Sequence, residues 1–456
     1  MSDVQTLGLS RWALWFGGLA FFTCYLGQTA LGVIQPTIAA DLDLSTSQSQ
    51  WVVNAFFLTL ALFGAPGGRL GDYYGHRQVL LLSFAIFALG AIVAAVSQGF
   101  VWLAIGIGVT GIGASTLYPA SAAMIANRTP PQSRGRAIGV YSAIGVSVLT
   151  LGPLAAGLLT EAIDWRALFA LQAVIAAGLV VVGWLRVDNR PVGKPAPFDY
   201  RGLALLMVAL TAMLVALMQA LTWGWDSPAT ICLLLAGLAG LAWFGALQLR
   251  TPDPLLDVAL LRVGELRGIV LAMFAAQFTI TSFIIYMATY FQHVLGLSPL
   301  TAALALAPAL VTQPIFNVLA GRMTDRIGAR RPALFGYLTS AVGLAWVALF
   351  LDNESYPLLL PGLLLLGPGV GPMFTSLLTD LSNVVSAEER GDANALVLTV
   401  RWIGAAAGTM VLGVVIHSGE GGLTPAAGPY AAAIGILACM CLLGAIACAV
   451  FLRPSR

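Results

Sequence analysis

The chain has 456 residues, of which 59% are hydrophobic and only 9% are charged, with a formal net charge of +2. A soluble protein of this length carries roughly a quarter charged residues, so the composition excludes a soluble globular protein and indicates a lipid environment. No basic tract suggests a nucleic-acid partner. The five cysteines lack the spacing of a metal site, and no catalytic or nucleotide-binding motif is present, so the sequence predicts no metal, no cofactor and no enzyme.

Apolar runs of about 20 residues, each long enough to cross a bilayer, recur along the whole chain. They predict an all-α integral membrane protein with fourteen spans, at about 12–34, 51–68, 78–97, 101–122, 136–159, 166–186, 201–222, 229–249, 268–291, 299–320, 332–351, 357–379, 392–416 and 429–451. The first run lacks the cleavage site of a signal peptide, so we expect it to stay as an anchor.

The distribution of basic residues predicts the orientation of these spans. If the N-terminus is cytoplasmic, 20 of the 22 Lys and Arg residues fall at the termini or in cytoplasmic loops. Only Arg166, at an outer helix end, and Arg401, inside a span, are left over. Because basic residues collect on the cytoplasmic side, both termini are expected there.

The sequence also contains an internal repeat. GRLGDYYGHR at 68–77 and GRMTDRIGAR at 321–330 both read G-R-x-x-D-x-x-G-x-R, 253 residues apart. At a nearly equal offset of 256, Gly152 falls on Gly408. Such parallel repeats predict two bundles that rock around a site at their interface.

The repeat divides the chain into three parts. Residues 1–190 and 258–456 are expected to form two six-helix bundles of the same orientation. Residues 191–257 are expected to form two additional helices that link them.

The paired loops resemble the signature loop of the major facilitator superfamily, and the two central helices are similar to its 14-helix drug:proton antiporter branch. In the fifth span, LGPLAAG at 151–157 resembles the antiporter motif of that branch, with Ala156 in place of a glycine. The resemblance covers essentially the whole chain and implies a hinge at Gly152, Pro153 and Gly157. The alternative is that these residues only allow close helix packing.

The resemblance also implies a conformational clamp on the cytoplasmic side. Asp72 ends the second span, where its carboxylate can meet the positive N-terminal end of a neighbouring helix, and Arg77 can bridge to helix C-terminal carbonyls. The alternative is a solvated loop whose charges only set the topology. The clamp residues are Gly68, Asp72, Gly75 and Arg77, with a weaker copy at Gly321, Asp325, Gly328 and Arg330.

The sequence departs from the family pattern where proton movement is usually located. Gly27 replaces an acid in the first span, and Ile107 replaces an arginine in the fourth. In the same span, residues 106–111 match G-x-G-x-x-G, but without a preceding strand this pattern predicts helix packing and not a dinucleotide site. Another glycine–proline stretch, 367–372, is expected to break the hydrogen-bond ladder of the twelfth span and to act as a hinge or cavity wall. The alternative is that its glycines only allow close helix packing.

Arg401 is a charged residue inside an apolar stretch, about nine residues into its span. Inserting an arginine at the middle of a membrane-spanning helix costs about 2.5–3.5 kcal/mol, so Arg401 is expected to face the bundle interior or a water-filled cavity. No acid lies near the centre of a span, so Arg401 would favour neutral or anionic amphiphiles over cations. The alternative is that it bonds carbonyls, for example at 367–372, and only holds helices together. The candidate substrate or coupling residues are Arg401, Trp402, Gln28, Asn54, Tyr118, Tyr141, Gln277, Tyr286, Gln313 and Asn317.

Together these features predict a monomeric bacterial inner-membrane transporter of small amphiphilic molecules that works by alternating access. The family resemblance implies export as the direction and exchange for protons as the coupling. Its partners are the lipid bilayer and a small-molecule substrate. An uncoupled facilitator, an uptake transporter and a lipid transporter of the same fold remain as alternatives.

Overall fold

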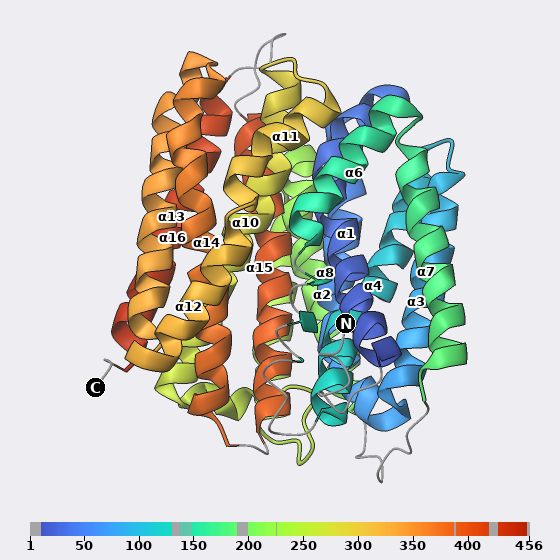
Figure 1. Ribbon diagram of the computed structural model, residues 1–456, viewed down its shortest axis with the longest axis vertical. Coiled ribbons are helices and arrows are strands. Elements are labelled where there is room, and N and C mark those ends of the chain that lie inside the picture. The colour runs from blue at the N-terminus through green and yellow to red at the C-terminus, as the bar shows by residue number, and fades with distance from the viewer. Residues whose placement is uncertain are drawn as a thin grey trace. The chain divides into compact units, whose positions relative to one another are not determined.

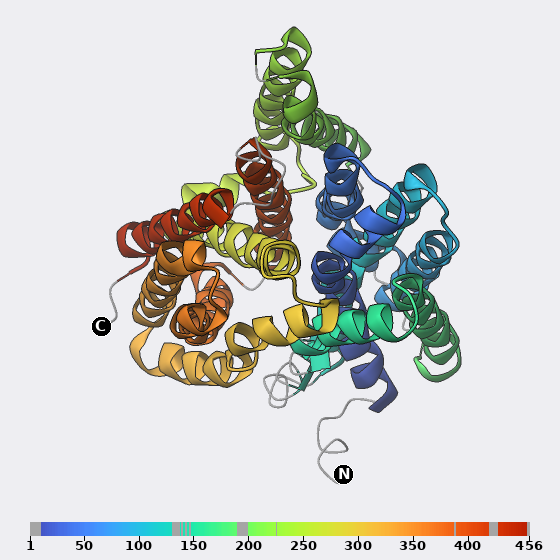
Figure 2. The same ribbon diagram turned by 90° about the horizontal axis from the view of Figure 1, so that it is seen from above.

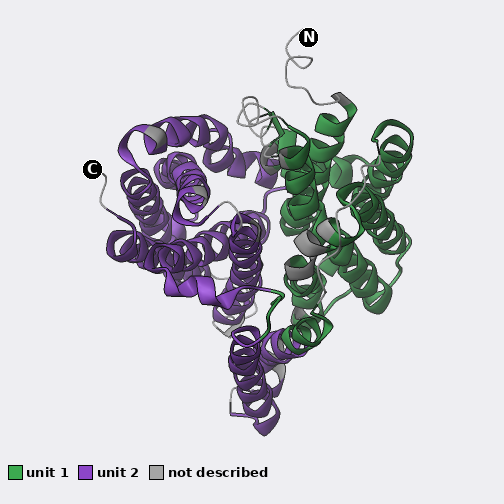
Figure 3. Ribbon diagram, turned by 90° about the horizontal axis from the view of Figure 1, so that it is seen from below, with its two compact units in different colours: residues 1–207, 251–255 green, residues 208–250, 256–456 purple. Residues whose placement is uncertain are grey.

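The computed structural model describes residues 11–129, 137, 140–141, 144–145, 147–188, 199–224, 226–386, 389–418 and 427–453. Every regular element among these residues is a helix (Figure 1). The chain divides into two compact units, Met1–Met207 with Thr251–Leu255 and Val208–Arg250 with Leu256–Arg456 (Figure 3). The division into three parts at 190 and 257 stays a prediction.

The helices follow the predicted order. Unit 1 contains α1 (Arg11–Asp41), α2 (Thr46–Tyr74), α3 (His76–Ala95), α4 (Phe100–Arg128), α6 (Val148–Ala162) and α7 (Arg166–Arg186), and α8 (Tyr200–Trp223) is divided between the units. Unit 2 contains α9 (Pro228–Gln248), η2 (Val258–Arg262), α10 (Gly264–His293), α11 (Pro299–Leu310), α12 (Gln313–Ile327), α13 (Arg330–Phe350), η3 (Leu351–Asn353), α14 (Tyr356–Val384), α15 (Arg390–Ser418) and α16 (Ala427–Phe451).

Twelve segments of the described residues are long and apolar enough to cross a membrane, and each coincides with one predicted span. The predicted span at 51–68 lies within α2, a helix of 29 residues. The predicted span at 136–159 overlaps α6, but part of it lies outside the described residues. The all-helical membrane architecture is therefore confirmed, and the count of fourteen spans stays a prediction.

Equivalent helices have the same neighbours in the two units. In unit 1, α3 packs against α4 and α7, and α1 packs against α6. In unit 2, α13 packs against α14 and α16 (Figure 2), and α10 packs against α15. The same order of contacts is expected when one six-helix pattern occurs twice in the chain.

Glycines set the closest of these helix contacts. A Cβ at Gly106 of α4 would lie 2.6 Å from the backbone nitrogen of Ala94, and a Cβ at Gly343 of α13 would lie 2.8 Å from the carbonyl oxygen of Gly362. Small residues let helix backbones approach closely inside a membrane. The glycines at 106–111 therefore pack α4 against its neighbours, as the sequence predicts.

The tenth predicted span, 299–320, is not one continuous helix. α11 ends at Leu310 and α12 begins at Gln313, with a turn between them. Pro314 lies in the first turn of α12. Because proline has no backbone N–H to donate, α11 cannot continue through it as a regular helix. By contrast, α14 runs as one helix through Gly367–Pro372, with Pro368 and Pro372 inside it, and its predicted role as a hinge or cavity wall stays a prediction.

Candidate functional site

The two signature loops have the same backbone geometry. Gly75 ends α2 with a φ of 95°, and Gly328 ends α12 with a φ of 76°. Each donates its N–H back into its own helix, to the carbonyls of Gly71 and Thr324 respectively. A left-handed φ favours glycine, which accounts for this residue in both copies of the motif.

The motif arginines bind carbonyls at the C-terminal ends of helices. Arg77 donates from Nε to the carbonyl of Gly183 at 3.1 Å and from a terminal nitrogen to that of Trp184 at 2.8 Å, both in the last turn of α7. Arg330 donates to the carbonyl of Ala449 near the end of α16, at 2.6 Å. A cation at a helix C-terminus is favourable because the last carbonyls carry partial negative charge. Both contacts stay within one unit, so each arginine fastens a peripheral helix to its own bundle.

The remaining clamp residues are only partly described. Gly321 lies on α12, 3.7 Å (measured to an added Cβ) from a methyl carbon of Thr375. The side chains of Asp72 and Asp325, and the surroundings of Gly68, lie outside the described residues. The clamp therefore stays a prediction.

The antiporter-motif glycine and its repeat mate make equivalent contacts. A Cβ at Gly152 of α6 would collide with the hydroxyl of Thr29 on α1. A Cβ at Gly408 of α15 would lie 2.6 Å from the carbonyl oxygen of Phe278 and would also crowd the hydroxyl of Ser282 on α10. Thr29 and Ser282 are themselves 253 residues apart, the offset of the signature loops. Gly152 therefore permits close packing of α6 on α1, and Pro153 and Gly157, which are buried beside it, leave α6 continuous.

Arg401 is buried inside unit 2, with a relative exposure of 5%. It donates from Nε and from a terminal nitrogen to the amide oxygen of Gln277 on α10, at 3.2 and 2.9 Å. Gln277 in turn donates to the hydroxyl of Thr281 at 2.9 Å. The guanidinium also lies over the ring of Phe374 on α14, 4.9 Å from the ring centre. A charged group is thus held by a neutral amide and an aromatic face, which both leave its positive charge in place.

The structure therefore brings together two of the predicted site residues, Arg401 and Gln277, and adds Thr281 and Phe374. The amide contact with Gln277 is one that the sequence did not indicate, and the suggested contact of Arg401 with the carbonyls of 367–372 stays a prediction. Trp402 is also buried, and its ring centre lies 6.0 Å from the guanidinium. Tyr286, farther along α10, donates to the carbonyl of Thr409 at 2.5 Å and so joins α10 to α15.

Unit 1 has no guanidinium at the equivalent place. Gly145 stands 256 residues before Arg401, and a Cβ there would collide with the ring of Phe21. Phe21 belongs to an aromatic cluster with Tyr25, Tyr118 and Tyr141, with ring centres of neighbouring members 4.8–6.2 Å apart. The predicted residues Tyr118 and Tyr141 thus lie together in an aromatic site, where the Tyr141 hydroxyl bonds to the Ser121 hydroxyl at 2.9 Å, whereas the site around Arg401 contains a charged group.

The acid that the family pattern places in the first span could not fit this structure unchanged. A Cβ at Gly27 would lie 2.8 Å from the ring of Phe56 on α2. Phe56 therefore fills the space that a larger side chain would need. Gln28 and Asn54, on α1 and α2, are buried in the same unit.

The last two predicted site residues lie on α12. Asn317 accepts a hydrogen bond from the hydroxyl of Thr375 on α14, at 3.0 Å. Gln313 is the first residue of α12 and is buried. Both residues lie at the helix break, at some distance in sequence from the Arg401 pair.

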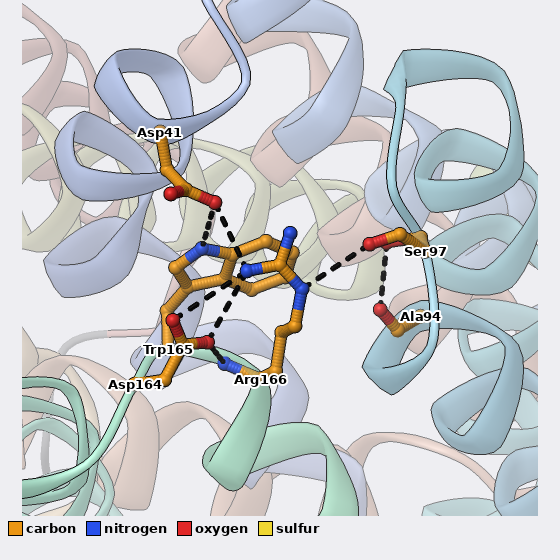
Figure 4. A network of polar contacts seen from close by, with 6 residues as sticks. All are labelled: Asp41, Ala94, Ser97, Asp164, Trp165 and Arg166. Carbon is orange, nitrogen blue, oxygen red and sulfur yellow. Dashed lines mark hydrogen bonds and ion pairs between the residues drawn. The ribbon is translucent and has the colours of Figure 1, made fainter.

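A further polar network, which the sequence did not predict, ties together one end of unit 1 (Figure 4). Arg166 donates to a carboxylate oxygen of Asp41 at 2.9 Å and to the carbonyl of Ser97 at 3.2 Å, and its guanidinium lies 4.1 Å from the ring centre of Trp165. Trp165 donates to the same Asp41 oxygen at 3.1 Å. Asp164 accepts from the backbone N–H of Arg166 at 2.7 Å. The network joins the end of α1, the α3–α4 turn and the start of α7.

Comparison with known proteins identifies the family. The family model of the Major Facilitator Superfamily matches residues 17–409 and, in a second alignment, residues 269–456. The chain is 29% identical over 400 residues to the multidrug resistance protein Stp of Mycobacterium tuberculosis (strain CDC 1551 / Oshkosh), covering 88% of this chain and 74% of the relative. It is 29% identical to the multidrug efflux pump LfrA of Mycolicibacterium smegmatis, covering 86% and 77%, and 27% identical to the tetracenomycin C resistance and export protein of Streptomyces glaucescens, covering 88% and 74%.

Solved structures show the same fold at low sequence identity. A D-xylose-proton symporter superposes with a TM-score of 0.69 at 18% identity, and the POT family transporter PepTSo with a TM-score of 0.70 at 16% identity. Each comparison covers 97% of both chains. The resemblance drawn from the signature loops is thus confirmed: the chain belongs to the major facilitator superfamily, a family of transporters and not of enzymes, and is related to its multidrug-resistance exporters.

Proposed function

We propose that this protein is a secondary active transporter that exports small amphiphilic molecules across the bacterial inner membrane in exchange for protons. Relatives named as drug efflux pumps and resistance proteins support export as the direction. The bias of basic residues toward one side supports cytoplasmic termini. In this proposal the protein acts as a monomer.

Alternating access requires two bundles that each move as a body. The observation that supports it best is the repeated arginine anchor, in which Arg77 and Arg330 each fasten a peripheral helix to its own unit. Because these arginines are engaged within their units, the acids of the motif, Asp72 and Asp325, are the groups that we assign to the clamp between bundles. A small change in their interactions can shift a balanced two-state equilibrium.

The Arg401 pair supports a preference for neutral or anionic substrates. Two N–H groups of the guanidinium bind the neutral amide oxygen of Gln277, an acceptor that brings no negative charge of its own. The nearest acids along α10 and α15, Glu265 and Asp392, lie in the first turns of those helices. A carboxylate-bearing amphiphile would gain a charge-assisted interaction there, whereas a lipophilic cation would be repelled.

Transport into proteoliposomes tests this preference with a matched pair of fluorescent amphiphiles that differ only in a carboxylate or a quaternary ammonium group. We expect wild-type protein to transport the anion faster than the cation. Arg401→Ala should abolish this preference, and Arg401→Lys should restore it only in part, because an ammonium lacks the planar fork of a guanidinium. Equal rates for the two probes in the wild type would contradict the assignment.

Cysteine labelling tests the orientation. The exposed native cysteines Cys232 and Cys439 must first be replaced. We expect Asn353→Cys to react with an impermeant maleimide from outside the cell, and Ser386→Cys to react only after permeabilisation. The reverse pattern would overturn the proposed topology.

A further inference from the structure

The break between α11 and α12 lies at the middle of a membrane span. The candidate span Pro299–Thr324 contains α11 and most of α12, and Val311 and Thr312 form the turn between them. Inside a bilayer, non-helical backbone is tolerated only where protein or a watered cavity satisfies its polar groups. Among the described residues, the backbone N–H groups of Thr312 and Ile315 do not bond to the carbonyls four residues before them.

A proline at the break leaves one carbonyl without its usual donor. Pro314 has no N–H to donate to the carbonyl of Leu310, its partner in a continuous helix. On α14, Pro368 and Pro372 likewise leave the carbonyls of Leu364 and Pro368 without their helical donors. Both segments therefore contain backbone oxygens that a continuous helix would have bonded.

Two glycines of α14 bring its backbone against the break. A Cβ at Gly367 would collide with the hydroxyl of Thr312. A Cβ at Gly371 would lie 2.9 Å from the backbone nitrogen of Asn317, 3.0 Å from its amide oxygen and 3.1 Å from the carbonyl oxygen of Gln313. The first turns of α12 thus bring the Asn317 amide oxygen and the Thr312 hydroxyl against the proline-containing segment of α14.

Side-chain oxygens at the break lack partners. Gln313 has a relative exposure of 5%, and among the described residues its amide oxygen is buried without a hydrogen bond. The hydroxyl of Thr312 is also buried without a hydrogen bond among the described residues. Leaving such groups unsatisfied costs about 1–3 kcal/mol each, so their presence at one place points to a missing ligand.

We propose that the α11–α12 break is a binding site for Na⁺, held by the Thr312 hydroxyl, the amide oxygens of Gln313 and Asn317, and backbone carbonyls. Hard cations take several oxygen ligands, and unwound carbonyls and the C-terminal ends of half-helices coordinate Na⁺ in other transporters. The positive end of α12 would instead favour an anion, but an anion would place another acceptor beside the unpartnered amide oxygen of Gln313. The unpartnered amide oxygen of Gln313 requires a donor or a cation.

This inference rests on the proposed function, in which Na⁺ would contribute to coupling alongside the proton. The site lies in unit 2, whereas the position of the missing family acid, Gly27, lies in unit 1 and is covered by Phe56. Ion binding at the break therefore does not depend on the acid that the family pattern places at position 27.

Thermal unfolding of the purified full-length protein tests the site without any transport assay. The midpoint is measured in NaCl, KCl and choline chloride at equal ionic strength. We expect a saturable increase that is specific to NaCl, because a ligand that binds only the folded state raises the unfolding midpoint. The same midpoint in all three salts would overturn the proposal, and so would an equal increase in choline chloride, which would point to the anion.

Two variants and a matched control locate the effect. Gln313→Leu and Thr312→Val each remove one oxygen and should weaken the apparent Na⁺ affinity by about tenfold or more, equivalent to about 1.4 kcal/mol. Gln292→Leu removes an amide that bonds the carbonyl of Ala288 near the end of α10, and should keep the wild-type response. Should Gln313→Leu fail to fold, Thr312→Val decides alone, and an unchanged Na⁺ response in it contradicts the site.

The binding result is independent of the export assays. If Na⁺ does not bind but the amphiphiles are exported, the inference fails and the proposed function stands. If Na⁺ binds and no amphiphile is exported, the proposed function fails and the site stands.

Discussion

We expect Gln277→Leu to destabilise the protein more than Arg401→Met, although arginine is the larger and charged partner. Gln277→Leu removes the acceptor of two guanidinium N–H groups and leaves the charge in the interior. A hydrogen bond to a charged group contributes about 1.5–3 kcal/mol, so the loss should be at least of that size. Arg401→Met removes the charge and leaves only the neutral amide oxygen of Gln277 without its donor, which should cost about 1–3 kcal/mol. Stranding the charge in Gln277→Leu should cost more, about 3–5 kcal/mol, as when one partner of a buried charged pair is removed.

The double variant removes both partners of the buried pair at once. When both partners of a buried polar pair are replaced by apolar residues of similar volume, stability is often unchanged or improved. Gln277→Leu combined with Arg401→Met should therefore be more stable than Gln277→Leu alone, and the coupling can be read from a double-mutant cycle.

Unfolding of the purified protein in mixed micelles with increasing denaturing detergent measures these differences. Both the double variant and Arg401→Met should lose the preference for the anionic probe while remaining folded. If Gln277→Leu costs no more than Arg401→Met, the guanidinium does not depend on this amide and the description of the site is wrong.

Three further predictions concern the rest of the molecule. Asp72→Asn should slow transport strongly, whereas its effect on stability should stay within about 0.3–2 kcal/mol, the range of a charge–dipole contact; wild-type transport in this variant would refute the clamp. Gly408→Ala should lower the unfolding midpoint because the added Cβ meets the Phe278 backbone, at a cost of about 1–3 kcal/mol for overpacking. Gly435→Ala, where an added Cβ meets open space, should leave the midpoint unchanged. Equal effects of the two substitutions would contradict the packing. Arg166→Ala should cost less than about 1 kcal/mol, since the ion pair is partly exposed to solvent, and a larger loss in the same unfolding assay would show that the network does more than join helix ends.

The sequence was sufficient for the helices and for the repeat because both depend on local patterns. Apolar runs of the right length predict spans, and Gly75 and Gly328 mark helix ends that need a left-handed residue. The interior position of Arg401 also followed from its neighbours in the sequence. Its partner did not, since Gln277 is 124 residues away on another helix and only the packing of α10 on α15 brings them together.

The helix break could not be located from the sequence either. Prolines occur in α11, α12 and α14, so the local signal is the same in each helix. α14 stays continuous where it packs between α12 and α13, whereas the span of α11 and α12 is interrupted at Val311. Tertiary contacts decide which proline-containing segment breaks. The pairing of Asp41 with Arg166 was hidden for a similar reason, although a lone basic residue at an outer helix end was a signal that an acid should be sought nearby.

The central claim, proton-coupled export by alternating access, is tested most directly by imposing a pH gradient on proteoliposomes. The liposomes contain equal concentrations of the anionic amphiphile and of Na⁺ on both sides, so only the proton gradient can drive net movement. We predict that wild-type protein accumulates the amphiphile against its own gradient on the acidic side, and that Asp72→Asn does so far more slowly. An amphiphile that stays equally distributed under the pH gradient, while still equilibrating rapidly down its own gradient, would identify a facilitator and contradict this account.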